Sequence, residues 1–228
     1  MTTIQQNLQA VQNELSGSAA RLVAVSKYHP ADAINEAYVS GQRIFGESHV
    51  QELCAKYSAL PTDIEWHFIG HLQTNKVKYI APYISLIHSV DSLKLLKEID
   101  KQAAKTSRTI DCLLQIHIAA EETKFGFTPT EVMQMLDEGQ WRELQHTRIV
   151  GLMCMATNTD DCSQIQREFH TVHLLFETLK QKYFDNNAQF CELSMGMSDD
   201  YHIALNEGST LVRIGSRIFG ERNYDNHC

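Results

Sequence analysis

The sequence lacks several features that mark common protein classes. It has only 4 prolines in 228 residues, and its 6 cysteines form no C-x-x-C pair, which excludes a proline-rich linker and the usual zinc and dithiol motifs. The longest apolar run, residues 149–156, is far too short to cross a bilayer, and the polar N-terminus does not resemble a secretory signal. We therefore expect a cytoplasmic protein with reduced thiols and no membrane contact.

An excess of basic residues is also missing. Lysine and arginine number 20 against 28 acidic residues, which gives a net charge of −8, and no basic stripe interrupts this balance. Nucleic acid is not an expected partner, because binding to a phosphate backbone depends on such a stripe. A small anion is still compatible with this charge, since backbone N–H groups can hold one phosphate locally.

Short apolar runs without strict alternation recur along the chain, which is typical of parallel strands buried on both faces. Eight strands are predicted, at residues 22–25, 43–45, 65–69, 84–88, 110–118, 148–153, 188–193 and 211–214. Amphipathic helices are predicted between them, most clearly over residues 91–105, from 128–129 onward and over 163–183. This alternation indicates right-handed βαβ units.

Eight such units in 228 residues predict an α/β protein with a (β/α)8 barrel of the TIM type. Apolar residues at 4-3-4 spacing over residues 4–15 add an N-terminal helix within residues 1–20, packed on the barrel. We expect residues 1–228 to form one domain. An open doubly wound sheet is the alternative, but no G-x-G-x-x-G follows the first strand and no G-x-x-x-x-G-K loop is present.

Lys27 directly follows the first predicted strand, at the end of the barrel where active sites lie. Partial burial there would lower the pKa of its amine and make the amine available to a carbonyl compound. A surface lysine beyond a strand end is the plainer alternative.

Hydroxyl and glycine residues follow the last two predicted strands. Ser194 opens the turn after the seventh strand, and Gly215 and Ser216 follow the eighth, where a helix is expected to begin. A phosphate site commonly lies at this place in barrels. Arg213 shares a strand face with Gly215, beside the first strand of a closed barrel. With Lys27, this arrangement suits a phosphorylated aldehyde that carries a ring nitrogen, and pyridoxal phosphate (PLP) is such a molecule.

Several stretches, taken together, resemble one known family. They are LVAVSKY (22–28), FGE (45–47), WHFIG (66–70), HSVD (88–91), GLM (151–153), LSMGMS (193–198) and VRIG (212–215). The chain resembles the pyridoxal phosphate homeostasis protein family, whose barrel is similar to the N-terminal domain of alanine racemase. Two places depart from the family pattern. Ser48 stands where the family usually has Asn, and residues 117–126 replace a more usual Asn-rich stretch.

The resemblance implies a Schiff base between PLP and Lys27, a phosphate held by Ser194, Gly215 and Ser216, and an Arg213 that faces the ring nitrogen. The implied function is PLP storage, delivery or buffering, with PLP-dependent apo-enzymes as recipients and no catalytic residue. A guanidinium keeps its proton and so disfavours a protonated ring, which weakens the ring as an electron sink. We expect a monomer without substantial turnover, because the chain offers no room for the second domain of a racemase.

Two other functions remain open at this point. The first is a PLP-dependent amino-acid racemase or a related enzyme of low activity, and the second is a barrel aldolase that uses Lys27 without PLP. Histidine pairs with ligand-like spacing occur at residues 67 and 71 and at residues 170 and 173. No cysteine or carboxylate set completes either pair, so no metal site is predicted.

Overall fold

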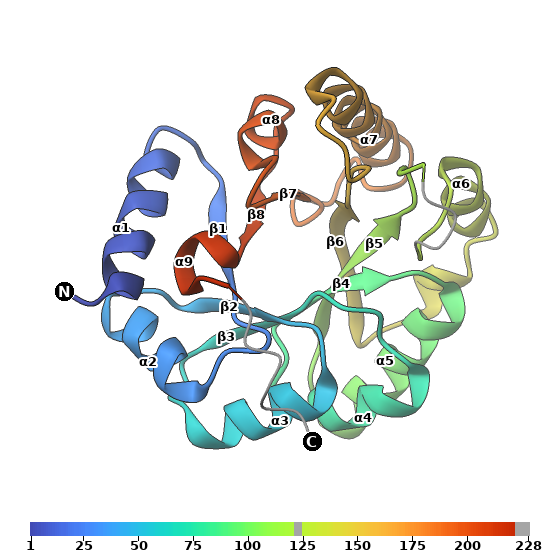
Figure 1. The fold of residues 1–228 in the computed structure, drawn as a ribbon. Helices are drawn as coiled ribbons and strands as arrows, with labels where there is room; N and C mark the ends of the chain where they lie inside the picture. The colour runs from blue at the N-terminus through green and yellow to red at the C-terminus, as the bar shows by residue number, and fades with distance from the viewer. Residues whose placement is uncertain (121–124, 222–228) are drawn as a thin grey trace.

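The computed structural model describes residues 1–120 and 125–221. In this part of the chain, eight parallel strands close into a barrel in sequence order, with the last strand paired to the first. They are β1 (Arg21–Val25), β2 (Ile44–Glu47), β3 (Glu65–Phe68), β4 (Leu86–Val90), β5 (Ile110–Ile116), β6 (Thr147–Cys154), β7 (Glu192–Met197) and β8 (Leu211–Ile214). The predicted (β/α)8 barrel is confirmed, and the open doubly wound sheet is excluded (Figure 1).

Helices surround the barrel (Figure 1). They are α1 (Thr3–Leu15), α2 (Ala31–Val39), α3 (Val50–Ala59), α4 (Val77–Ile80), α5 (Leu93–Lys105), α6 (Pro129–Asp137), α7 (Cys162–Tyr183), α8 (Tyr201–Asn206) and α9 (Ser216–Phe219), with 3-10 turns at Thr74–Lys76 and Gln140–Glu143. Their starts follow from the sequence. Thr128 and Glu131 cap α6 reciprocally in front of Pro129, and the Asp161 carboxylate accepts two amide hydrogens at the start of α7. The predicted helices of these segments are confirmed.

The N-terminal helix α1 packs on the barrel through its apolar stripe. The buried side chains of this stripe are Leu8, Val11 and Leu15. Two polar contacts join α1 to α9: the Asn7 amide donates to the Ile218 carbonyl at 3.2 Å, and Arg217 pairs with Glu14 at 2.8 Å. The extra helix therefore supports the segment that follows β8, where the candidate site is predicted.

Side chains of the strands alternate between the barrel interior and the layer beneath the helices. The interior contains a small apolar cluster formed by Val23, Leu86, Leu113, Val150, Met153 and Leu211. Polar side chains also lie inside the barrel, and His67, His88, Ser194 and Arg213 are each at most 4% exposed. Buried polar groups of this kind require hydrogen-bond partners, so their contacts are central to the site.

The seventh strand lies four residues further along the chain than predicted. The prediction placed it at 188–193, whereas β7 runs from Glu192 to Met197. Gly196, inside this strand, has φ +88°, and a Cβ added there would lie 2.7 Å from the Cβ of Ala204 in α8. Glycine is therefore needed for close packing of α8 on the strand, and the S-M-G-M sequence is not the turn that its composition indicates. The fourth strand is similarly shifted, since β4 begins two residues later than predicted.

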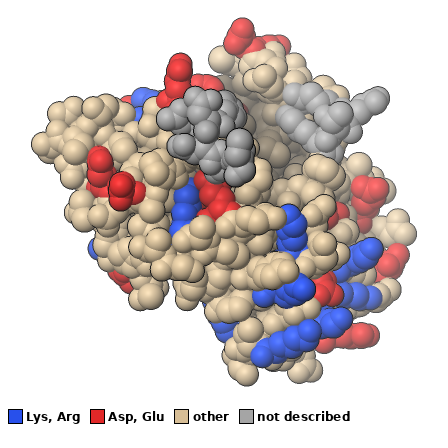
Figure 2. Space-filling view, turned by 60° about the horizontal axis from the view of Figure 1, so that its bottom comes forward, with Lys and Arg blue, Asp and Glu red and all other residues tan. Residues whose placement is uncertain are grey.

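The outer surface mixes charges of both signs. Figure 2 shows a face on which basic side chains gather to one side, with acidic side chains among them. Among the described residues, no helix is both long enough and apolar enough to span a membrane.

Candidate functional site

The turn after β1 and the turn after β8 lie side by side at the mouth of the barrel. Lys27 follows β1 by two residues and is half-buried. Gly215 follows β8, and Ser216 begins α9. A Cβ on Gly215 would lie 3.0 Å from the carbonyl oxygen of Val25, the last residue of β1. The structure thus brings together three of the predicted site residues, Lys27, Gly215 and Ser216.

Ser198 is the hydroxyl residue that lies beside the Gly215–Ser216 turn. Its Oγ accepts from the Gly215 N–H at 3.4 Å and lies 3.1 Å from the Ser216 Oγ. The predicted strand 188–193 places Ser194, and not Ser198, just beyond its end. With β7 continuing to Met197, Ser198 is the first residue beyond the strand, and a correct strand end would have identified it.

Ser194 is fully buried inside the barrel, and its hydroxyl is bonded to other side chains. Its Oγ accepts from Arg213 Nη1 at 2.5 Å and lies 2.9 Å from His88 Nδ1. A contact between Ser194 and a phosphate stays a prediction, because the described contacts of this hydroxyl are internal to the barrel.

The Arg213 guanidinium is buried among neutral oxygens. Nη1 also donates to the Ser194 carbonyl at 2.9 Å, and Nη2 donates to the Cys154 carbonyl at 2.8 Å. None of the ion pairs within residues 1–120 and 125–221 includes Arg213. Burial lowers the pKa of Arg213, whereas Cys154 and Asp200 act in the opposite direction. Because a guanidinium keeps its proton in proteins, the interior carries a positive charge that no carboxylate of residues 1–120 and 125–221 pairs directly.

Two buried histidines continue from Ser194 across the barrel. His88 Nε2 lies 3.0 Å from His67 Nδ1. His88 belongs to β4 and Ser194 to β7, which are not neighbours in the barrel, so their hydrogen bond crosses the interior. Burial lowers the pKa of His67 to about 3 and lowers that of His88 well below its ordinary value. Both imidazoles are therefore neutral at neutral pH.

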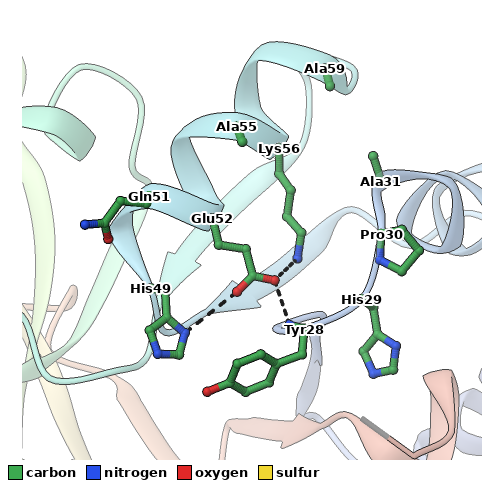
Figure 3. A pocket seen from close by; sticks show the side chains of 10 residues that line it. All are labelled: Tyr28, His29, Pro30, Ala31, His49, Gln51, Glu52, Ala55, Lys56 and Ala59. Atoms are coloured by element: carbon green, nitrogen blue, oxygen red, sulfur yellow. Dashed lines mark hydrogen bonds and ion pairs between the residues drawn. The ribbon is translucent and has the colours of Figure 1, made fainter. Parts of the chain in front are cut away.

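A buried charged cluster on α3 holds the turn that follows β1. Lys56 Nζ donates to the Ser26 carbonyl at 2.8 Å and to carboxylate oxygens of Glu47 and Glu52 at 2.7 Å each. Glu52 also accepts from the Tyr28 N–H at 2.6 Å (Figure 3). Tyr28 has φ +66°, which is uncommon for a residue other than glycine. The contacts of α3 thus fix the residues on both sides of the half-buried lysine.

Sequence reasoning did not assign this cluster. Glu47 lies in the FGE stretch that carries the family resemblance. The i,i+4 spacing of Glu52 and Lys56 is equally typical of an exposed helix face. In the structure the Ser26 hydroxyl donates to Glu47 at 2.6 Å, and burial raises the pKa of Glu47 to about 7. Because this pKa is close to neutral, the net charge of the cluster becomes more negative as Glu47 ionises near pH 7.

A pocket of about 800 Å³ opens beside the same turn, between α2 and α3 (Figure 3). Small apolar side chains and polar side chains both line it, among them Pro30, Ala31, Ala55, Ala59, His29, His49 and Gln51. The His29 ring stacks on Phe219 of α9 with centroids 5.2 Å apart. The pocket is therefore adjacent to the turn after β8, and its volume is within the usual range for small-molecule sites.

The positions that depart from the family pattern contact neighbouring histidines. Ser48 Oγ lies 3.4 Å from His49 Nδ1. Within the 117–126 stretch, residues 121–124 lie outside the described residues, and the Phe125 ring stacks on His71 with centroids 3.8 Å apart. Among the described residues, no group of three or more His, Cys, Asp or Glu side chains is placed to hold a metal ion.

Comparison with known proteins identifies the family. The model of the alanine racemase N-terminal domain matches residues 1–223. The pyridoxal phosphate homeostasis protein of Pasteurella multocida is 40% identical over 229 residues, which cover 98% of this chain and 97% of that protein. The chain belongs to the pyridoxal phosphate homeostasis protein family. The family member from Aquifex aeolicus is 39% identical over 208 residues, covering 91% of this chain and 89% of the relative. The resemblance seen in the sequence is confirmed.

A solved structure of similar sequence has the same barrel. PipY of Synechococcus elongatus is 36% identical, and its structure without PLP matches with a TM-score of 0.89. Its structure with PLP bound matches with a TM-score of 0.85, and each match covers 95% of this chain and 100% of PipY. A PLP-binding protein therefore shares this fold over nearly the whole chain.

Proposed function

We propose that this protein binds PLP at the mouth of the barrel, as a Schiff base with Lys27, and serves intracellular PLP homeostasis by storing, delivering or buffering the cofactor. The observation that carries the proposal is the meeting of three different groups there. They are the half-buried Lys27, the buried charge of Arg213, and the Ser198–Gly215–Ser216 turn. PLP supplies an aldehyde, a ring nitrogen and a phosphate, one for each of these groups.

The phosphate is assigned to the turn after β8 together with the end of β7. Gly215 and Ser216 offer backbone N–H groups and a hydroxyl, and Ser198, which directly follows the neighbouring strand β7, adds a second hydroxyl. A Cβ on Gly215 would crowd Val25, so glycine keeps the two turns close together. Ser194 acts through Arg213, whose guanidinium it holds with both its carbonyl and its hydroxyl.

Arg213 favours storage over turnover. Its permanent positive charge disfavours a proton on the ring nitrogen, and an unprotonated ring withdraws electrons less strongly. We propose that the protein acts as a cytoplasmic monomer without substantial turnover and that PLP-dependent apo-enzymes receive its cofactor. A PLP-dependent racemase of low activity is the second candidate, because the family model that matches residues 1–223 is that of a racemase domain.

Transfer of cofactor distinguishes these functions. The PLP-loaded protein, freed of unbound PLP, should activate an apo-enzyme that depends on PLP, whereas Lys27→Ala treated in the same way should not. Lys94→Ala, which replaces an exposed lysine on α5, is the matched control and should transfer PLP normally. Failure of the native protein to activate any of a panel of apo-enzymes would refute delivery. Exchange of the Cα hydrogen of L-amino acids for deuterium at catalytic rates would instead establish the racemase.

A further inference from the structure

The hydrogen bonds that run from Arg213 to His67 have one direction. A guanidinium can only donate, so Ser194 Oγ accepts from Arg213 at 2.5 Å. The Ser194 hydroxyl is fully buried, and its other hydrogen-bond contact among the described residues is His88 Nδ1 at 2.9 Å. Its own hydrogen must therefore be donated to that nitrogen, because the alternative leaves a buried O–H group without an acceptor.

The same reasoning assigns the protons of both imidazoles. Since His88 accepts at Nδ1, its proton lies on Nε2, from which it is donated to His67 Nδ1 at 3.0 Å. His67 then carries its proton on Nε2. The Ser194 hydroxyl and the His88 Nε2–H each have an acceptor in this arrangement, and reversing either histidine tautomer places two donors or two acceptors against each other.

We propose that His88 is a positioning residue for Arg213 and that His67 holds His88 by accepting its Nε2–H. By accepting the Ser194 hydrogen, His88 turns the oxygen lone pairs of Ser194 toward Arg213 and so keeps the guanidinium in one orientation. The effect on PLP rests on the proposed function, whereas the hydrogen-bond chain itself does not depend on it. The proposed role of both histidines is exerted through Ser194 and Arg213.

The charges around this hydrogen-bond chain require both histidines to be neutral. A protonated His88 would donate to Ser194 Oγ, leave the Ser194 hydrogen without an acceptor, and add a positive charge next to Arg213. The field of Arg21 on β1 acts on both histidines in the same sense. Arg21 also lines a pocket beside His67, and the other charged side chains of that pocket are Glu65, Asp111, Arg148 and Glu192.

The first test uses the protein without PLP. Nitrogen-15 NMR of labelled histidine in the native protein should show His67 and His88 as neutral Nε2–H tautomers from pH 5 to pH 8, assigned by their loss in His67→Gln and His88→Gln. A proton on Nδ1 of His88, or titration of either residue near pH 6.5, would overturn the proposal. This result tests the hydrogen-bond chain even if the protein fails to bind PLP. In that case the proposed function fails separately.

The second test measures binding of PLP and of N-methyl-PLP, whose ring nitrogen has no lone pair. His88→Leu removes the acceptor for Ser194 and should weaken PLP binding about tenfold, the effect of losing about one hydrogen bond. N-methyl-PLP should be affected much less, so discrimination between the two compounds should fall. His88→Gln, whose amide can both accept from Ser194 and donate to His67, should restore PLP binding and discrimination.

Ser89→Ala is the matched control, because Ser89 is buried on the same strand and its hydroxyl has no hydrogen-bond partner among the described residues. It should bind both compounds as the native protein does. An equal loss for PLP and N-methyl-PLP in His88→Leu would indicate a general structural effect and contradict the positioning role. Unchanged binding of PLP in His88→Leu would contradict it as well.

Discussion

Replacing Lys56 with methionine removes the ammonium from a cluster that holds two carboxylates. The side chain of Lys56 is 7% exposed, and those of Glu47 and Glu52 are 0% and 10% exposed. Removing one partner of a buried ion pair costs about 3–5 kcal/mol, because it leaves an uncompensated buried charge. A protein of this size loses about 2–4 °C of Tm per kcal/mol, so Lys56→Met should lower the Tm by roughly 6–20 °C.

The loss of unfolding free energy in Lys56→Met should depend on pH. Burial raises the pKa of Glu47 to about 7, from an ordinary value of 4.5. A raised pKa in the folded state contributes stability that is complete below pH 4.5 and is lost as the pH rises through 7. Without Lys56 the pKa of Glu47 rises further. The free energy of unfolding of the variant should therefore continue to fall above pH 7, by about 1.4 kcal/mol per pH unit.

Urea unfolding followed by circular dichroism at pH 5.5, 7.0 and 8.5 measures this difference. The exposed control Lys94→Met should remain close to the native protein at each pH. Adding Glu47→Gln to Lys56→Met should remove most of the pH dependence, because the glutamine amide cannot ionise. A deficit below 1 kcal/mol at pH 8.5, or one that is the same at all three values, would refute the reasoning.

Three further predictions concern the phosphate turn, the end of β7 and the barrel histidines. Ser198→Ala and Ser216→Ala should each weaken PLP binding about tenfold in a calorimetric titration but leave pyridoxal, which has no phosphate, unaffected; equal losses for both compounds would contradict the assignment. Gly196→Ala should destabilise the protein by more than 2 kcal/mol in urea unfolding, because of its positive φ and the clash with α8; a native-like midpoint would be inconsistent with that packing. The pKa values of His67 and His88 are lowered in the folded state, so their contribution to the free energy of unfolding is complete above pH 6.5. It should fall on acidification by up to about 1.4 kcal/mol per pH unit for each histidine. If the free energy of unfolding were independent of pH both in the native protein and in His67→Gln/His88→Gln, the histidines would not be the source of this pH dependence.

The barrel could be predicted because its signals are local. Buried parallel strands are continuous apolar runs, and helix starts such as Thr128-Pro129 depend on neighbouring residues. The approach of Lys27 to Gly215 also followed from the sequence, since a closed barrel places the first and last strands together. These parts of the site required only the order of the strands.

The remaining parts of the site depend on contacts between distant elements. The end of β7 depends on how Gly196 packs against α8, and an error of four residues there kept Ser198 from being considered as a residue just beyond the strand. The burial of Lys56 could not be predicted because its partners, Ser26 and Glu47, lie on other elements. The direction of the His88 hydrogen bonds is visible only when strands on opposite sides of the barrel are placed together.

The most direct test of the account is the attachment of PLP to Lys27. The native protein, mixed with PLP, reduced with borohydride and digested, should carry the mass of reduced PLP on the peptide that contains Lys27. Before reduction its visible spectrum should differ from that of free PLP, and Lys27→Ala should lose both signals while Lys94→Ala keeps them. Label on another lysine, or an unchanged visible spectrum in Lys27→Ala, would contradict the account.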